Sequence, residues 1–211
     1  MNLADQIARH QVPGVWMPNP EAHLNSVRDR THFEWAKNKI ASLHDLMPDT
    51  LKILDVGCYD GWLDFLLLDY FEATEIDGLE LIPNLCASAR AYVEANGIKN
   101  YRTIEGTLWA AGNPAHVRHD YDAILCFEML EHIYLEEVPQ FLILMEAINK
   151  PTGRILLSLP DQRHEDNPQH LWTPTKSVID ELLKNKKGAT VEYKSYPGTD
   201  IPGNFFIEYL P

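Results

Sequence analysis

Residues 51–61 of this 211-residue chain read LKILDVGCYDG, and this stretch decides the fold. Apolar residues dominate positions 51–56, and a short apolar run bounded by turn residues is typical of a buried strand. Gly57 and Gly61 enclose the following turn, where glycine lets the backbone bend sharply and approach a ligand. Leucine-rich residues 62–71 predict a helix directly after the turn. A strand, a glycine turn and a helix form the opening unit of a parallel α/β sheet.

The same alternation of strand and helix recurs along the rest of the chain. Helices are predicted at residues 83–96, which Gly97 closes as a left-handed cap, at 136–149, and from the Thr173-Pro174 pair to about 187. Strands are predicted at 74–81, 101–105, 121–127, 153–159, 189–196 and 205–210. The fold class is therefore α/β, with a doubly wound, seven-stranded, mainly parallel sheet whose last strand is antiparallel.

Upstream of the sheet, Asn19 and Pro20 predict the start of a helix that runs to about Met47. We divide the chain into an N-terminal helical segment, residues 1–49, and a sheet domain, residues 50–211. The minimal doubly wound fold has no counterpart of the first segment. We expect this segment either to cover the ligand pocket, to pack on a sheet edge, or to pair two subunits as a homo-oligomer.

The chain is acidic, because 31 aspartates and glutamates outnumber 18 lysines and arginines to give a net charge of −13. Nucleic-acid binders usually carry a basic surplus, so this charge argues against a nucleic-acid partner and an anionic membrane surface. The three cysteines form no Cys-x-x-Cys pair. Neither a secretory signal pattern nor an apolar stretch of membrane-spanning length is found, and we expect a cytoplasmic protein.

Ligands of doubly wound sheets bind beyond the carboxyl ends of the strands, so the residues there are the candidates for chemistry. Asp55 lies near the end of the first strand, and Glu80 lies at the end of the second, where a carboxylate can accept hydrogen bonds from a ribose diol. The turn is not the dinucleotide fingerprint, since Tyr59 and Asp60 stand where glycines are needed. It is not a phosphate loop either, because no Gly-Lys-Ser/Thr follows.

From about residue 50 to 211, the chain resembles the class I S-adenosylmethionine-dependent methyltransferases. The resemblance rests on ILDVGC at 53–58 with Gly61, on Glu80, on IEGT at 104–107, and on YDAILCFEMLEH at 121–132. It implies a Rossmann-like methyltransferase fold with S-adenosylmethionine as cofactor and S-adenosylhomocysteine as product. The cofactor-binding residues that it implies are Asp55, Gly57, Cys58, Tyr59, Gly61, Glu80, Leu81, Gly106, Thr107, Leu108 and Phe127.

The resemblance also implies a role for each part of the pocket. Asp55 would orient the turn and the methionine amino group of the cofactor, and the backbone of residues 57–61 would wrap its methionine portion. Glu80 would hold the ribose hydroxyls, with Leu81 on one face of the adenine and residues 106–108 along its other side.

Phe127, at the end of the fourth strand, would lie between cofactor and acceptor. Two residues depart from the family pattern. Tyr59 stands where the family often has glycine, so the turn carries a large side chain at the pocket mouth. Thr107 replaces a frequent aspartate that accepts a hydrogen bond from the adenine amino group, which leaves that bond to a hydroxyl or to the backbone.

Candidate residues for the acceptor side follow the fourth and fifth strands. We predict that His132, Glu128 and His170 are catalytic, with a histidine as general base or acceptor contact. A structural alternative is that Glu128 and Glu131 are only carboxylates at a helix start, which the helix dipole favours. Metal-dependent methyltransferases of RNA 3′ ends use a similar Glu-x-x-Glu-His with a further histidine, for which His164 or His170 would serve. We assign no metal ligand and leave this alternative open.

By this resemblance, the expected function is methyl transfer to a small-molecule acceptor, and the histidines of the acceptor side favour oxygen. A metal-assisted RNA 2′-O-methyltransferase is one alternative, against which the acidic charge argues. A non-catalytic module with the same fold is another, which the intact cofactor-binding residues disfavour. The N-terminal segment adds four candidate acceptor contacts: Trp16, His23, Arg28 and His32.

Overall fold

A computed structural model describes residues 14–46, 50–108, 117–161, 169–196, 199 and 203–211. Seven strands among these residues form one sheet in the order β3-β2-β1-β4-β5-β7-β6. The strands are β1 (Leu51–Val56), β2 (Thr74–Glu80), β3 (Tyr101–Glu105), β4 (Tyr121–Phe127), β5 (Asn149–Pro160), β6 (Lys187–Lys194) and β7 (Asn204–Leu210). Neighbours are parallel from β3 to β5, and β7 is antiparallel to both β5 and β6. The predicted α/β fold with an antiparallel last strand is therefore confirmed.

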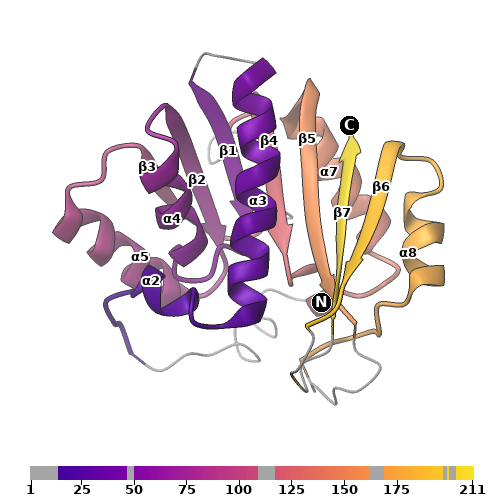
Figure 1. Ribbon diagram of the computed structural model, residues 1–211, viewed down its shortest axis with the longest axis horizontal. Helices are drawn as coiled ribbons and strands as arrows, with labels where there is room; N and C mark the ends of the chain where they lie inside the picture. Colours follow the sequence, from indigo (N-terminus) through magenta and orange to yellow (C-terminus); the bar gives the residue numbers. More distant parts are fainter. Residues whose placement is uncertain (1–13, 47–49, 109–116, 162–168, 197–198, 200–202) are drawn as a thin grey trace.

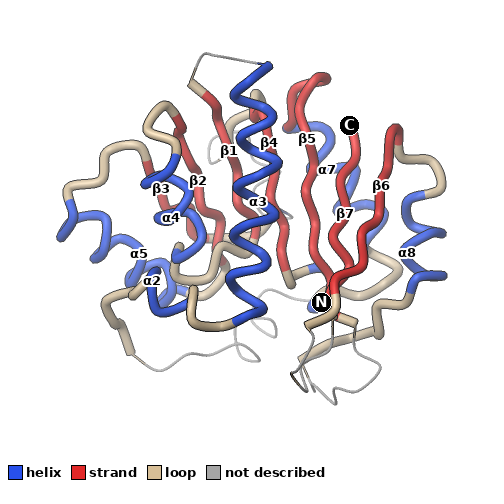
Figure 2. The backbone as a smooth tube through the Cα atoms, viewed as in Figure 1, coloured by secondary structure: helices blue, strands red, loops and turns tan. Residues whose placement is uncertain are grey.

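Helices cover both faces of the sheet (Figures 1 and 2). Three of them share a core with one set of strand side chains: α3 (Val27–Leu46), α4 (Trp62–Tyr70) and α5 (Pro83–Asn96). Helices α7 (Val138–Ile148) and α8 (Lys176–Leu183) share a core with the other set. In β1, Leu51 and Ile53 belong to the first core, and Leu54 and Val56 to the second. Successive side chains of a strand point to opposite faces of the sheet, so both faces of β1 contribute apolar residues to a core.

The N-terminal helix differs from its prediction. Asn19 caps it as expected, since its side chain accepts the N–H of Ala22, but α2 (Pro20–His23) ends after four residues. Helix α3 then begins at Val27, where the Ser26 hydroxyl accepts the N–H of Asp29 at 3.3 Å. The continuous helix predicted from Pro20 was wrong because Ser26 starts a new helix, and the predicted end at Met47 lies outside the described residues.

Two boundaries near the end of the chain also differ. Strand β5 begins at Asn149 rather than at Gly153, because its pairing with β4 contains an irregularity that holds extra residues. The Asn149 amide donates to the Arg154 carbonyl at 3.1 Å across that irregularity. Helix α8 is capped by Thr175, whose hydroxyl accepts the Val178 N–H, rather than by the Thr173-Pro174 pair. Periodicity located both elements, and local hydrogen bonds set their ends.

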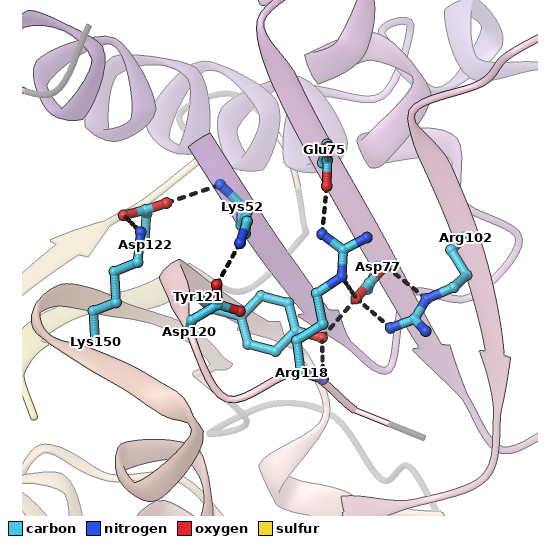
Figure 3. A network of polar contacts seen from close by, with 9 residues as sticks. All are labelled: Lys52, Glu75, Asp77, Arg102, Arg118, Asp120, Tyr121, Asp122 and Lys150. Atoms are coloured by element: carbon cyan, nitrogen blue, oxygen red, sulfur yellow. Dashed lines mark hydrogen bonds and ion pairs between the residues drawn. The ribbon is translucent and has the colours of Figure 1, made fainter. Parts of the chain in front are cut away.

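A buried carboxylate ties three strands together on the sheet (Figure 3). Asp77 of β2 is 2% exposed and accepts two hydrogen bonds from the Arg102 guanidinium of β3, at 2.9 and 2.6 Å. The Tyr121 hydroxyl of β4 donates to it at 2.7 Å, and Arg118 pairs with it at 3.3 Å. A buried charge is tolerated only when it is paired in this way, so this cluster is part of the fold.

The parallel strands β1, β2 and β4 all point towards the lower edge of the sheet in Figure 1, where their carboxyl ends meet. The first part of α3 and the turn after β1 lie at the same edge. No helix within the described residues is both long enough and apolar enough to cross a membrane. Because the carboxyl ends of the parallel strands meet at the lower edge of the sheet, a ligand site is expected there.

Candidate functional site

A cavity of about 540 Å³ opens at the carboxyl ends of the strands. Its walls come from the turn after β1, the ends of β2 and β4, residues 106–108 after β3, and the start of α3. This volume is in the range of ordinary small-molecule sites. The apolar side chains of Leu81, Leu108, Phe127 and Ile133 contribute much of the lining, and a few acidic and imidazole groups enter it.

The turn after β1 is shaped by residues with left-handed backbone angles. Gly57 has φ of 79° and Gly61 has φ of 83°, and Tyr59 between them has φ of 57°. The Gly57 N–H donates to the Leu79 carbonyl of β2 at 2.8 Å, which fixes the turn to the neighbouring strand. The Gly61 N–H donates to the Cys58 carbonyl, and Gly61 is the N-cap residue of α4. The predicted turn is therefore present, with Tyr59 at the cavity wall and 43% exposed.

Glu80 is fixed at the end of β2 by backbone donors. One carboxylate oxygen accepts the Ile82 N–H at 2.8 Å, and the other accepts the Tyr59 N–H at 3.0 Å. Burial nevertheless raises the pKa of Glu80 to about 7, because these two bonds only partly replace water. Glu80 is 8% exposed and lies in the cavity wall, so its remaining lone pairs are available to a ligand.

Asp55 is the second buried acid of this wall. Burial raises its pKa to about 7, while an interaction with the carboxyl group of Asp64 on α4 lowers it and the charge of Glu80 raises it further. Asp64 is 0% exposed, and burial raises its pKa well above the ordinary value. Among the described residues, no lysine, arginine or histidine forms an ion pair with Asp55 or Glu80. This part of the cavity therefore holds three buried acids, of which Asp55 and Glu80 have no ion-pair partner among the described residues.

The N-terminal segment contributes to the cavity mouth. Arg28, Asp29 and His32 of α3 line the cavity directly. Trp16 and His23 do not. The Trp16 indole N–H donates to Asp60 at 3.3 Å, and the His23 ring stacks on Trp62 with centroids 4.5 Å apart. The segment thus packs over the turn after β1 through Trp16 and His23, and reaches the cavity with α3.

Glu128, at the end of β4, is held by groups from three other elements. The Ser158 hydroxyl of β5 donates to it at 2.9 Å and the Asn204 amide of β7 at 2.5 Å, while Arg28 and His32 of α3 pair with it. Burial alone would raise the pKa of Glu128, but His32 and Arg28 hold it at about 2. Glu128 is therefore a carboxylate at neutral pH, with its lone pairs largely occupied.

Two histidines and a glutamate gather beside Glu128. His132 lines the cavity at the end of a short 3₁₀ helix, η1 (Leu130–His132). His170 is not in the cavity wall, but its ring packs edge-on against His132 with centroids 4.7 Å apart. Glu131 is 0% exposed, and burial raises its pKa well above the ordinary value. One ligand atom of each of these three residues lies within 4.8 Å of those of the other two.

The structure gathers most of the residues predicted from the sequence. Gly61 does not line the cavity, because it closes the turn against Phe65 and Tyr101. His170 does not line the cavity, but its ring packs against that of His132, which does. His164 lies outside the described residues. The predicted residues that do line the cavity are Asp55, Gly57, Cys58, Tyr59, Glu80, Leu81, Gly106, Thr107, Leu108, Phe127, Glu128, His132, Arg28 and His32.

Several residues of the site were missed by the sequence reasoning. Asp64 faces Asp55, and Ser158 and Asn204 hold Glu128. The acid in the first turn of α4 was a visible signal for Asp64, since that helix start must lie next to the β1 end. No signal pointed to Asn204, because β7 is remote in sequence and only its antiparallel pairing with β5 brings it to the site.

Comparisons with known proteins find methyltransferases among the similar proteins. Residues 54–155 match a family model described as a methyltransferase domain. The ubiquinone biosynthesis O-methyltransferase of Rickettsia prowazekii (strain Madrid E) is 30% identical over 145 residues, which are 68% of this chain and 53% of that protein. The enzyme of the same name from Paraburkholderia phytofirmans is 29% identical over 160 residues, covering 67% of this chain and 64% of that protein. The chain thus spans between 53% and 64% of the length of these two curated relatives.

Solved structures show the same fold at low sequence identity. The bifunctional kinase-methyltransferase WbdD superposes with a TM-score of 0.72 at 15% identity, covering 98% of this chain and 45% of that one. The PH0226 protein of Pyrococcus horikoshii superposes with a TM-score of 0.63 at 20% identity, covering 89% and 93% of the two chains. Residues 54–155 therefore match a methyltransferase domain, and the chain shares its α/β fold with these solved structures.

Proposed function

We propose that this chain transfers a methyl group from S-adenosylmethionine to an oxygen atom of a small-molecule acceptor. The observation that carries the proposal is the pair of buried acids, Asp55 and Glu80, at the glycine turn of a methyltransferase domain. The preference for oxygen is supported by the O-methyltransferase name of the curated relatives and by the imidazoles on the acceptor side.

The residues of the cavity suit such a cofactor. S-adenosylmethionine carries a positive charge on its sulfur and another on its amino group, and the acids Asp55 and Glu80 in the wall form no ion pair with a described basic residue. Gly106 has φ of 145° and open space where a side chain would start, which leaves room for a flat base beside residues 107 and 108. A cation is the ligand that such a wall would stabilise.

Residues of this chain would hold the donor in three places. Glu80 keeps lone pairs for the ribose hydroxyls while the Tyr59 and Ile82 amides fix its orientation. Asp55 lies where the amino group of the methionine portion would enter, and Leu81 and Leu108 supply apolar surface for the adenine. When bound, the cofactor supplies an activated methyl group, so alignment of donor and acceptor is the main task of the protein, worth about 7–11 kcal/mol.

We propose that the acceptor lies between Phe127, His132 and the start of α3. Glu128 is occupied by Arg28, Ser158 and Asn204, so it serves best as an anchor that orients this wall. His132 at the cavity wall, supported by His170, is the candidate to take the hydroxyl proton of the acceptor. General-base catalysis of this kind typically contributes about 10²–10⁴-fold in rate.

Calorimetry of the full chain tests the proposal at its centre. S-adenosylmethionine and S-adenosylhomocysteine are each titrated into the folded protein, and both are expected to bind at one site per chain. Failure of both to bind a folded sample would overturn the proposal and leave a non-catalytic module with this fold. An RNA acceptor is less favoured because the net charge is −13 and the curated relatives are not named as RNA enzymes.

Glu80→Gln is expected to weaken donor binding by about 1.5–3 kcal/mol, because a charge-assisted hydrogen bond to the ribose is lost. Glu105→Gln is the matched control. Glu105 faces Glu80 in the register of β2 and β3, but it lies outside the cavity wall and pairs with Arg90 on the surface. Dissociation constants from calorimetry should separate the two variants. Equal affinities would contradict the ribose role of Glu80.

Donor affinity is expected to rise as the pH is raised from 6 to 8. The pKa values of Asp55 and Glu80 are near 7 in the free protein, so below that pH both groups are mostly neutral. A cationic donor favours the charged carboxylates, so binding releases protons, and affinity changes about tenfold per group over this range. Titrations in buffers of different ionisation enthalpy measure the release. Glu80→Gln should flatten the profile, and an affinity that falls with rising pH would refute the assignment.

A further inference from the structure

Asp64, in the first turn of α4, is buried without a hydrogen-bond donor for its carboxyl group. Its side chain is 0% exposed, and neither oxygen accepts a hydrogen bond from a donor among the described residues. An ionised carboxylate in that position would keep its full desolvation cost, because no donor replaces the lost water. The surroundings of Asp64 therefore favour the neutral carboxylic acid, which carries a proton that it can donate.

The carboxyl group of Asp55, near the end of β1, is the group that can receive this proton in a hydrogen bond. Burial and then the charge of Asp55 raise the pKa of Asp64 well above its ordinary value, and an interaction with the Tyr101 hydroxyl lowers it only in part. Burial raises the pKa of Asp55 to about 7, but its contact with Asp64 acts against burial. The two carboxyl groups therefore share one proton above pH 7, and that proton resides on Asp64.

The groups around the two acids contain no competing cation. The titratable groups that face Asp64 or Asp55 from the neighbouring elements are Glu80 of β2, Cys58 and Asp60 of the turn, and Tyr101 of β3. None of these is a lysine, arginine or histidine. Asp55 lines the cavity and Asp64 does not, so any effect of Asp64 on a bound ligand passes through Asp55.

We propose that Asp64 is a positioning residue for the methyl donor, which donates a hydrogen bond from its protonated carboxyl group to the Asp55 carboxylate. This bond occupies one oxygen of Asp55 and leaves the other for the amino group of the donor. It also allows Asp55 to be charged although it is only 4% exposed, because a hydrogen bond to the charged form favours that form. The contact of Asp55 with the donor rests on the proposed function, whereas the proton on Asp64 does not.

Infrared spectroscopy of the ligand-free chain at pH 8 tests the proton on Asp64. The difference spectrum between the unsubstituted chain and Asp64→Asn is expected to contain the C=O stretching band of a protonated carboxylic acid. Asp55 and Glu80 are mostly charged at this pH, since their pKa values are about 7. Asp69→Asn, an exposed position of the same helix, is the matched control and should lose only carboxylate bands. Absence of the acid band for Asp64→Asn would overturn the proposal, whether or not the chain binds the donor.

Calorimetry with two ligands tests the positioning role. S-adenosylhomocysteine has an amino group, whereas 5′-methylthioadenosine has the same nucleoside without the amino-acid portion. Asp64→Leu removes the hydrogen bond to Asp55, so it is expected to weaken binding of S-adenosylhomocysteine by about 10-fold or more. Its affinity for 5′-methylthioadenosine is expected to be unchanged, because that ligand has no group for Asp55 to bind. A merely structural defect would weaken both ligands alike.

Asp64→Asn is the conservative variant, because its amide N–H can donate to Asp55 in place of the acid. It should restore the affinity for S-adenosylhomocysteine at pH 8. In Asp64→Leu, Asp55 loses a bond that favours its charged form, so its pKa rises and the gain of affinity moves to higher pH.

Two outcomes of the calorimetry would overturn the positioning role: equal weakening of both ligands, or full affinity for S-adenosylhomocysteine in Asp64→Leu. If Asp64→Leu does not fold, Asp64→Ala removes the same bond without added volume. Failure of the unsubstituted chain to bind S-adenosylhomocysteine would overturn the proposed function and the positioning role with it. The infrared result would still decide whether Asp64 carries the proton.

Discussion

Asp77→Ala is expected to lower the free energy of unfolding by about 3 kcal/mol, a large part of the stability of a domain of this size. The substitution removes the carboxylate that joins β2, β3 and β4 (Figure 3). Arg102 is partly exposed and can return to water, but the Tyr121 hydroxyl is buried and loses its acceptor. An unpaired buried polar group carries its full desolvation cost, which is the main source of the effect.

Urea denaturation measures this loss against a control from the same network. Asp120 also pairs with a basic side chain, that of Lys52, but the Asp120 side chain is 47% exposed. Asp120→Ala should therefore change the stability by less than about 1 kcal/mol, since exposed ion pairs contribute little. A loss for Asp77→Ala as small as that for Asp120→Ala would show that water replaces the Asp77 contacts.

Gly57→Val is expected to weaken donor binding about 100-fold or more, which corresponds to about 2.7 kcal/mol or more. Gly57 has φ of 79°, where a β-branched side chain is strained. A Cβ added to Gly57 would also lie 2.7 Å from Cγ of Met129. The turn and the segment that follows β4 both line the cavity, so either shift distorts the donor site.

Gly97→Val is the control that separates the effect of backbone strain from the effect of a substitution in the turn after β1. Gly97 has φ of 64° at the end of α5, and no heavy atom lies within 4 Å of a Cβ built there. Both variants should lose about 1–2 kcal/mol of stability from the left-handed backbone, but only Gly57→Val should lose the donor. If Gly57→Val fails to fold, Gly57→Ala introduces the same clash with less strain. Donor binding equal to that of the unsubstituted chain would contradict the role of this turn.

The proposed donor half of the cavity could be predicted because its parts are local in sequence and the topology is regular. Asp55 and the glycine turn belong to one continuous stretch, and Glu80 ends the adjacent strand. Parallel neighbours in a doubly wound sheet bring their carboxyl ends to one edge, so two separate patterns meet without further information. The same reasoning placed Gly106 and Phe127 in the cavity wall.

The proposed acceptor half could be predicted only in part. The run from Glu128 to His132 was recognised, but its members turned out to face different surroundings. Glu128 has φ of 53°, so the chain bends sharply there and separates its carboxylate from the Glu131 cluster. The sequence leaves a shared metal site open only because the run is similar to that of the metal-dependent methyltransferases of RNA 3′ ends, and this similarity does not reveal the bend at Glu128.

Periodic apolar strands, caps and glycines were sufficient to predict an α/β sheet and its ligand edge, because these features depend on interactions between residues close together in the chain. Only the folded chain brings Asn204 of the antiparallel β7 and Arg28 of α3 to Glu128. It also brings His170 to Glu131 and leaves that carboxylate buried without a hydrogen bond from another described residue. Long-range packing creates such contacts, and no local propensity encodes which distant side chains meet.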